Sequence, residues 1–329
     1  MTSADNFPRR RSRSHKIVLY GLLLFILSLA GCDQPAPQIK PVALTGRTMG
    51  TTYSIKLVPP TDSLQVQELH DEINGSLKEI NQLMSTYIPD SELMKFNAHQ
   101  GADWYPVSEK TQQVVSMALD IAVATEGALD ITVGALVELW GFGRKKGDDM
   151  VPSAEEITAL IGTVNYHQVQ TREDPPALKK VNAQVTLDLS SIAKGFAVDQ
   201  IAEILEKSGI QNYLVEVGGE MRGNGVKQEN KPWVIAIERP TSIDRSIQQL
   251  ISLENHGLAT SGDYRNYFEK DGKRYSHTIN PQTGRPITHN LASVSVIAKT
   301  SMEADAWATA FTVLGPEKGF QLAQQKKMA

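Results

Sequence analysis

Apolar residues recur every three or four positions in two long segments, 64–86 and 108–126. This spacing is typical of amphipathic helices. A Ser-x-x-Glu signature at 153–156 is a capping box and predicts another, shorter helix. Further helices are expected at 191–207 and 301–314.

Short segments rich in β-branched and aromatic residues predict strands between these helices. Helices and strands alternate without the regular βαβ order of a doubly wound sheet, so the pattern favours a mixed α+β fold. Residues 324–329 are expected to be a frayed end, and the charged run 145–149 a surface loop. The predicted strands are 48–58, 184–189, 213–217, 233–237, 249–253 and 292–297.

The N-terminal segment has the composition of a secretory signal. Residues 9–16 are rich in arginine and lysine, and 17–31 form a mostly apolar run, shorter than the roughly 20 residues that a membrane-spanning helix needs. The run ends in Leu-Ala-Gly-Cys, and Cys32 is the only cysteine in the chain. This resembles the lipobox of bacterial lipoproteins, in which the cysteine carries the lipid, with an ordinary signal peptide as the alternative. Asp33 resembles a signal for retention in the inner membrane.

These features divide the chain into a signal peptide at 1–31, a proline-rich tether at 32–44 and one domain at 45–329. A lone cysteine forms no internal disulfide, so the domain must be stabilised by its hydrophobic core. The net charge of the whole chain is −4, and no basic run follows the signal segment. Nucleic acid is therefore not expected as a partner, because that binding needs clustered lysine and arginine.

Residues 188–195, Asp-Leu-Ser-Ser-Ile-Ala-Lys-Gly, lie where a predicted strand leads into a predicted helix. Free N–H groups at a helix start favour an anion, and Lys194 would add a positive charge for a phosphate. The alternative is that Ser190 or Ser191 caps the helix and Lys194 is solvated.

Asp305 and Thr309 are four residues apart in a predicted helix and therefore share one face. Such a pair can supply oxygen ligands to Mg²⁺, a cation that also binds substrate phosphates. The alternative is an acidic residue near a helix start and a buried threonine. His277 precedes a Pro-x-x-Gly turn, where a histidine can be a general base or a hydrogen-bonded structural residue.

The chain lacks the HExxH, CxxC and GxSxG patterns, so a zinc site or a Ser-His-Asp hydrolase has little support. The glycine-rich segment 218–225 lacks the GxGxxG order of dinucleotide-binding folds and is better explained as a tight turn.

Several motifs occur in a fixed order, at 46–53, 84–87, 127–134, 188–195, 217–219, 260–264, 277–286 and 304–310. Together they resemble the ApbE family of FAD:protein FMN transferases, over nearly the whole chain after the tether. The resemblance implies a mixed α/β fold related to the T-fold, with two lobes and FAD in the cleft between them.

The resemblance also implies a reaction. FMN would pass from FAD to a Thr or Ser hydroxyl of a target protein through a phosphoester bond, with Mg²⁺ as cofactor and AMP released. Implied targets are subunits of the Na⁺-pumping NADH:quinone reductase and of the related Rnf complex. Lipid anchoring at Cys32 would hold the enzyme on the periplasmic side of the inner membrane.

By the same resemblance, His277 would accept the proton of the target hydroxyl. The implied metal ligands are Ser191, Asp305, Ala308 and Thr309. The implied FAD contacts are Met49, Tyr87, Ala128, Leu129, Asp130, Asp188, Lys194 and Ile279, with Tyr87 near the isoalloxazine ring.

Two positions depart from the family pattern. Asn280 stands where many members have aspartate, which keeps the turn geometry but loses a carboxylate. Ser190 and Ser191 replace a glycine-rich pair, which leaves the metal contact of Ser191 open.

Two alternative functions remain at this level: hydrolysis of FAD to FMN and AMP, and a lipoprotein that binds FAD without catalysis. A thiamine- or iron–sulfur-related role has little support, because one lipidated cysteine cannot ligate a cluster.

Overall fold

The computed structural model describes residues 40–61, 63–144, 151–240, 246–262 and 267–328, which belong to one compact unit spanning 39–329. The predicted signal peptide, Cys32, Asp33 and the loop at 145–149 lie outside the described residues. Among the residues that are described, no helix is long and apolar enough to cross a membrane.

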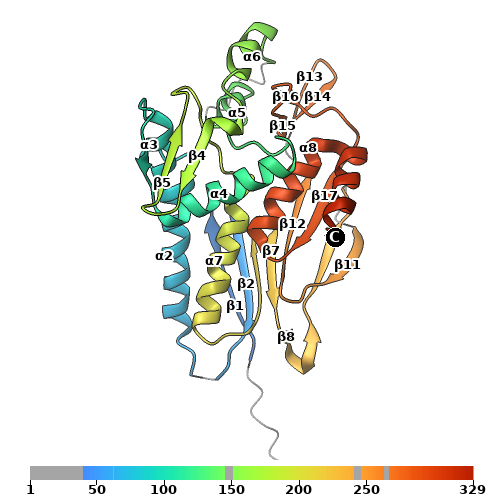
Figure 1. Ribbon diagram of the computed structural model, residues 1–329. Helices are drawn as coiled ribbons and strands as arrows, with labels where there is room; N and C mark the ends of the chain where they lie inside the picture. The colour runs from blue at the N-terminus through green and yellow to red at the C-terminus, as the bar shows by residue number, and fades with distance from the viewer. Residues whose placement is uncertain (1–39, 62, 145–150, 241–245, 263–266, 329) are drawn as a thin grey trace, which may run out of the picture. The chain divides into compact units, whose positions relative to one another are not determined.

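A six-stranded sheet organises this unit (Figure 1). Every neighbouring pair of strands is antiparallel. In spatial order the strands are β1 (Val42–Thr48), β2 (Thr51–Val58), β6 (Asn212–Val217), β7 (Glu220–Asn224), β12 (His256–Gly262) and β17 (Ser293–Ala298).

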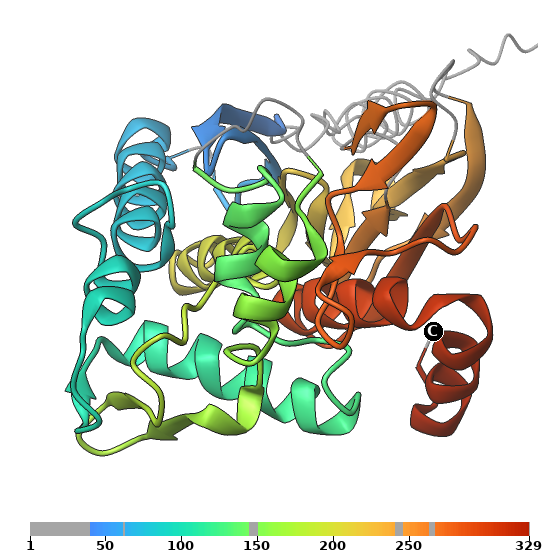
Figure 2. The same ribbon diagram turned by 90° about the horizontal axis from the view of Figure 1, so that it is seen from above.

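Three helices pack on one face of the sheet: α2 (Val66–Met84), α7 (Ala193–Lys207) and α8 (Ser301–Lys326). Seen from above, α7 lies between α2 and α8 (Figure 2). The hairpin of β10 (Val234–Glu238) and β11 (Ile247–Ser252) covers part of the other face, where Ile235 packs with apolar residues of the sheet. Alternation of side chains along each strand places apolar residues on both faces.

A second group of elements comes from two parts of the chain, residues 92–180 and 267–286. Its small sheet has the order β3-β5-β4, and hairpins β13–β14 and β15–β16 lie near α5 and α6 (Figure 1). The group comprises α3 (Glu92–Ala98), β3 (Tyr105–Pro106), α4 (Glu109–Ala124), α5 (Gly134–Leu139), α6 (Ala154–Ile161), η1 (Tyr166–Gln168), β4 (Val169–Arg172), β5 (Ala177–Lys180), β13 (Tyr267–Lys270), β14 (Lys273–Ser276), β15 (Ile279–Asn280) and β16 (Arg285–Pro286). The short elements β8 (Val226–Lys227), η2 (Gln228–Asn230) and β9 (Lys231–Pro232) follow β7.

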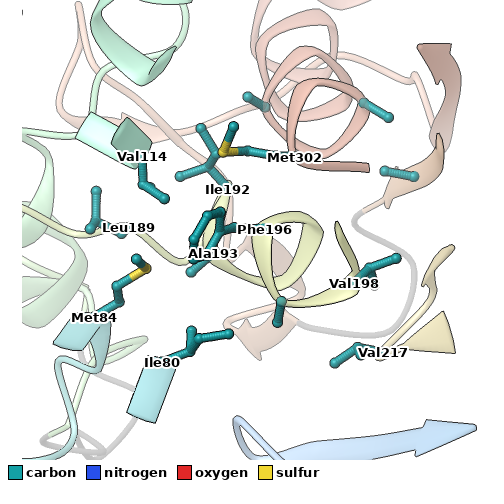
Figure 3. Close-up of a cluster of buried hydrophobic side chains, with 14 of the residues drawn as sticks. Ile80, Met84, Val114, Leu189, Ile192, Ala193, Phe196, Val198, Val217 and Met302 are labelled. Atoms are coloured by element: carbon teal, nitrogen blue, oxygen red, sulfur yellow. The ribbon is translucent and has the colours of Figure 1, made fainter. Parts of the chain in front are cut away.

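The main core fills the space between the helices and the sheet. Figure 3 shows Val114 of α4, Phe196 of α7 and Met302 of α8 near Ile192, in the same buried cluster as Met84 of α2. Removing this much apolar surface from water is the main term that stabilises the unit, since no disulfide is available. Ile192, Ala193 and Phe196, at the start of α7, belong to this core, so the core fixes the position of that helix end.

The mixed α+β prediction is confirmed, and most predicted helices and strands are present within a few residues of their expected bounds. The capping box is also present, because Ser153 and Glu156 exchange side-chain to backbone bonds at the start of α6. β1 begins at Val42, so the last residues assigned to the tether already belong to the sheet.

Three elements differ from the prediction. The single strand expected at 48–58 is instead the turn and second strand of a hairpin, because Met49 and Gly50 adopt positive φ angles of 49° and 72°. Such a two-residue turn matches the twist of an antiparallel hairpin. The strand expected at 184–189 is absent apart from one bridge at Thr186. The expected frayed end is helical as far as Lys326.

Helix α8 continues past Leu314 through a break at Gly315, where φ is 79°. Pro316 has no N–H for the carbonyl of Thr312, four residues earlier. His289 Nε2 lies 2.7 Å from that carbonyl oxygen, and its Nδ1 accepts the N–H of Leu291, so Nε2 is the donor. The histidine therefore replaces the hydrogen bond that the proline removes.

Candidate functional site

The candidate site lies at one end of the six-stranded sheet. Residues 49–50 form the turn between β1 and β2, and 218–219 form the turn between β6 and β7. Tyr53 of β2 pairs with Val217 of β6, so both turns project from the same end of the sheet.

Three charged side chains from different elements meet beside these turns. Lys194 Nζ, at the start of α7, lies 3.3 Å from Glu220 Oε1 and 3.6 Å from Asp305 Oδ1. Both carboxyl groups are buried, with each residue 4% exposed, whereas Lys194 is half-buried. A Cβ added at Gly218 would lie 3.3 Å from Lys194 Cδ, which places the β6–β7 turn against the lysine.

The start of α7 holds one of these carboxylates directly. The backbone N–H of Gly195 donates to Asp305 Oδ2 at 3.0 Å, so a helix N-terminus faces the carboxylate of another helix. Gly195 permits this approach, because a Cβ there would lie 2.3 Å from the carbonyl oxygen of Ser301. The sequence predicts an anion at this helix start, and the carboxylate of Asp305 occupies part of that position.

Burial and charge oppose each other in the cluster. Burial raises the pKa of Asp305, against the effects of Lys194 and the Gly195 N–H. Burial also raises the pKa of Glu220, with Lys194 opposing the rise and Asp305 adding to it. Burial favours the neutral amine of Lys194, but the two carboxylates outweigh it and raise the lysine pKa. The lysine thus stays cationic, as a phosphate-binding group must be.

A second charged group positions α8 beneath the site. Asp199 of α7 accepts the N–H groups of Ser301 and Met302 at 3.0 and 2.8 Å, which are otherwise unpaired at the start of α8. Arg222 of β7 donates to the same carboxylate at 3.0 Å. Asp199 therefore ties α7, α8 and the sheet together one turn away from Lys194.

Tyr87 and His277 both contact Phe142. The hydroxyl of Tyr87 donates to the carbonyl of Phe142 at 3.5 Å, and the Phe142 and His277 rings meet edge-on with centroids 6.3 Å apart. Tyr87 is 64% exposed, which leaves its ring available for stacking. Burial, and then the charges of Asp188 and Glu138, raise the pKa of the Tyr87 hydroxyl, so Asp188 belongs to the same neighbourhood.

Asp130 has a structural part in holding its loop. One carboxylate oxygen accepts from both the backbone N–H and the hydroxyl of Thr132, and the other accepts from the N–H of Tyr166. Burial raises the pKa of Asp130 in spite of these bonds. Its carboxylate oxygens are thus occupied within the protein.

The predicted FAD contacts Ala128, Leu129 and Ile279 have buried side chains, 3%, 2% and 6% exposed. Leu129 belongs to the main core, and Ile279 packs with Trp140 in a smaller cluster. Contact between these residues and a ligand would therefore involve their backbone.

The turn after His277 is held at both ends. Asn280 Oδ1 accepts the N–H of Gln282 at 2.9 Å, so asparagine closes the turn as expected. Trp140 Nε1 donates to the carbonyl of Gly284 at 2.8 Å. This turn and α5 are thus fixed together near His277.

The predicted metal ligands are partly brought together. Asp305 and Thr309 share one face of α8, and Asp305 Oδ1 is directed at Lys194. The carbonyl of Ala308 accepts the hydroxyl of Thr312 at 2.8 Å, and Ser191 is half-buried just before α7. Among the described residues, no group of three or more His, Cys, Asp or Glu side chains is arranged so that it could hold a metal ion. The carboxylate of Asp305 and the hydroxyl of Thr309 are nevertheless oxygen donors of the kind that Mg²⁺ prefers, and the Asp305 carboxylate is buried.

Sequence reasoning missed Glu220 and Phe142. Glu220 follows two glycines, and a charged residue directly after such a turn was the available signal. Phe142 had no signal, because its contacts to Tyr87 and His277 join segments that are far apart in the chain.

Comparisons with known proteins agree with this arrangement. A model of the ApbE family matches residues 49–329. A FAD:protein FMN transferase of Vibrio cholerae serotype O1 is 45% identical over 306 residues, covering 93% of this chain and 90% of that protein. A FAD:protein FMN transferase of Escherichia coli K12 is 42% identical over 315 residues, covering 94% and 90%.

Solved structures give the same result. The flavin transferase ApbE from Vibrio cholerae matches with a TM-score of 0.82 and 43% identity, covering 88% of this chain and 92% of that one. The apo form of the flavinyl transferase ApbE from Pseudomonas stutzeri matches with a TM-score of 0.81 and 41% identity, covering 88% and 90%.

Proposed function

Because this chain belongs to the ApbE family, we propose that it transfers FMN from FAD to a hydroxyl group of a target protein. The oxygen of a Thr or Ser side chain bonds to the FMN-side phosphorus, and the bond from that phosphorus to the bridging oxygen breaks. AMP leaves, and FMN stays joined to the target through a phosphoester. The observation that carries the proposal is the ion pair between Lys194, at the start of α7, and Asp305 of α8.

The proposed cofactor is Mg²⁺, held by Asp305 Oδ1 and the hydroxyl of Thr309, with backbone oxygens of Ser191 and Ala308 as further ligands. When bound, the cation neutralises charge on the diphosphate oxygens, which is the main requirement of phosphoryl-type transfer. Ala308 would share its carbonyl with the Thr312 hydroxyl. Lys194 stays cationic beside these ligands and supplies a second positive charge for the diphosphate.

The flavin end of FAD would lie toward Tyr87, whose exposed ring can stack on the isoalloxazine. Met49 in the β1–β2 turn and Asp188 before α7 would contact the same ligand, together with the backbone of residues 128–130 and Ile279. The side chain of Asp130 would act by holding this loop.

His277 would accept the proton of the attacking hydroxyl. It follows β14 directly, and the locked turn at 280–284 fixes the backbone on its other side. A general base of this kind contributes roughly 10²–10⁴ to the rate.

The proposed setting is the periplasmic side of the inner membrane, with a lipid on Cys32, as the N-terminal sequence indicates. The proposed targets are flavoprotein subunits of the Na⁺-pumping NADH:quinone reductase or Rnf type. Periplasmic anchoring would bring the enzyme to such subunits.

The test is incubation of the purified protein with FAD, MgCl₂ and a recombinant target domain, followed by mass spectrometry. We expect the mass of FMN to be added to a Thr or Ser of the target, with one AMP released for each FMN attached, and no addition when EDTA replaces MgCl₂. Abundant AMP in the absence of a target would instead favour an FAD pyrophosphatase. Intact FAD after prolonged incubation with target and metal would favour a binding protein without catalysis.

A further inference from the structure

The proposed reaction assigns no role to the carboxyl group of Glu220. Glu220 is the first residue of β7 and is 4% exposed. Its Oε1 lies 3.3 Å from Lys194 Nζ, whereas its buried Oε2 has no hydrogen-bond partner among the described residues. A buried carboxylate oxygen without a partner is costly, so its presence calls for a functional explanation.

Lys194 pairs with two carboxyl groups, those of Glu220 and Asp305. Of the two, only Asp305 is also a proposed ligand of the cation. Gly195 holds Asp305 Oδ2, so Oδ1 is the oxygen that remains for a divalent cation. Lys194 Nζ lies 3.6 Å from that same Oδ1. Because ammonium and cation repel each other and compete for one oxygen, Lys194 needs another acidic partner when the cation binds.

We propose that Glu220 is a positioning residue that keeps Lys194 in place when a divalent cation takes Asp305 Oδ1. The inference rests on the proposed function, since it assumes that Asp305 binds the cation. Without Glu220, Lys194 has Asp305 as its only acidic partner in the cluster and closes on Oδ1. Removal of Glu220 therefore weakens cation binding, and this effect depends on the presence of Lys194.

The experiment measures Mn²⁺ binding to the FAD-free protein, by the electron paramagnetic resonance signal of the unbound ion. The variants are Glu220→Gln, Lys194→Met and the double variant, and thermal unfolding of each confirms that it is folded. Glu220→Gln should raise the Kd for Mn²⁺ at least tenfold. Lys194→Met should not raise it, and the double variant should bind within about threefold of Lys194→Met.

A matched control is Glu203→Gln, because Glu203 lies on the same helix as Lys194 but pairs with Lys207. Its Kd should equal that of the unaltered protein. If Glu220→Gln does not fold, Glu220→Asp takes its place with the same expectation, since the shorter side chain moves the carboxylate away from Lys194.

Equal Mn²⁺ affinity in Glu220→Gln and the unaltered protein would overturn the inference alone, provided that the unaltered protein still transfers FMN. Equal weakening with and without Lys194 would assign Glu220 a merely structural or direct ligand role and would also overturn it. Transfer by the unaltered protein without any divalent cation would instead refute the magnesium requirement of the proposed function, and the inference with it.

Discussion

Single residues at this site combine chemistry with burial. His277 is the proposed base, Lys194 and Asp305 are a partly buried ion pair, and Tyr53 shows how burial controls ionisation in the neighbouring strand. His277 and Tyr53 can each be tested by a single substitution, whereas Lys194 and Asp305 act as a pair.

Replacing His277 by glutamine should lower turnover by roughly 10²–10⁴ and leave FAD affinity nearly unchanged, because a base acts on the proton and not on the bound dinucleotide. Steady-state transfer kinetics and FAD titration by fluorescence separate the two quantities. His256→Gln is the control, since His256 is exposed on β12. Equal losses of turnover and FAD affinity would make His277 a binding residue.

Tyr53→Phe should lower the free energy of unfolding at pH 7 by about 1–2 kcal/mol, because Tyr53 loses hydrogen bonds to His70 and Asn74. Burial raises the pKa of the Tyr53 hydroxyl, against the hydrogen bond to Asn74. The neutral phenol therefore contributes its full stability below pH 10 and loses it as pH rises through the folded-state pKa.

Phenylalanine does not ionise, so the difference between the two proteins should shrink above pH 10. Urea unfolding at intervals between pH 8 and pH 11 measures this. A constant difference over that range would mean that the Tyr53 hydroxyl does not ionise as burial predicts.

At the scale of elements, the crossing of α7 and α8 decides the geometry of the site. Gly195 and Gly257 both lie against the backbone of Ser301, at positions where a Cβ would come within 2.3 Å of it. Asp199 caps α8 from α7, and Gly195 holds Asp305 in the opposite direction. The two helices are therefore joined at both polar and steric points.

Gly195→Ala should destabilise the protein by about 1–3 kcal/mol, because its Cβ meets backbone atoms that cannot move independently. It should also weaken Mg²⁺-dependent transfer by displacing Asp305. Gly75→Ala is the matched control: Gly75 is exposed in α2 with no atom within 4 Å of its added Cβ, so it should stabilise by about 0.5–1 kcal/mol. Chemical denaturation of both variants measures the two changes in stability, and a stabilising Gly195→Ala would contradict the close approach of Gly195 to Ser301.

At the scale of the whole unit, α3 is joined to the residues that lead into α7, which are distant from it in the chain. Asn97 of α3 pairs with Leu187 through both its amide atoms, accepting the N–H at 2.8 Å and donating to the carbonyl at 2.9 Å. This side chain therefore makes the two hydrogen bonds to Leu187 that a neighbouring strand would otherwise make, directly before Asp188.

Asn97→Ala should lower the free energy of unfolding by about 2 kcal/mol or more, since two backbone groups lose their partners. FAD affinity should fall as well, because the segment 187–194 would lose its support. Gln100→Ala, in an exposed position just beyond α3, should change stability by less than about 0.5 kcal/mol. Unaltered stability in Asn97→Ala would show that other contacts hold this segment.

The sequence alone determined the elements whose signals are local. The apolar repeat of α2 and the capping box of α6 follow from a few neighbouring residues, and so does the pairing of Asp305 with Thr309 on one helix face. The motifs from 46 to 310 also led to the family, which the comparisons confirm. The expected roles of the site residues remain predictions.

Only the tertiary structure decided which polar and charged groups, distant in the chain, pair with one another. Nothing local indicates that Glu220 and Asp305 hold the same ammonium, that an asparagine takes the place of a strand beside Leu187, or that Asp130 is occupied by its own loop. The physical reason is that burial and pairing depend on elements brought together across the core, whereas helix and turn signals depend on residues that are adjacent in the chain.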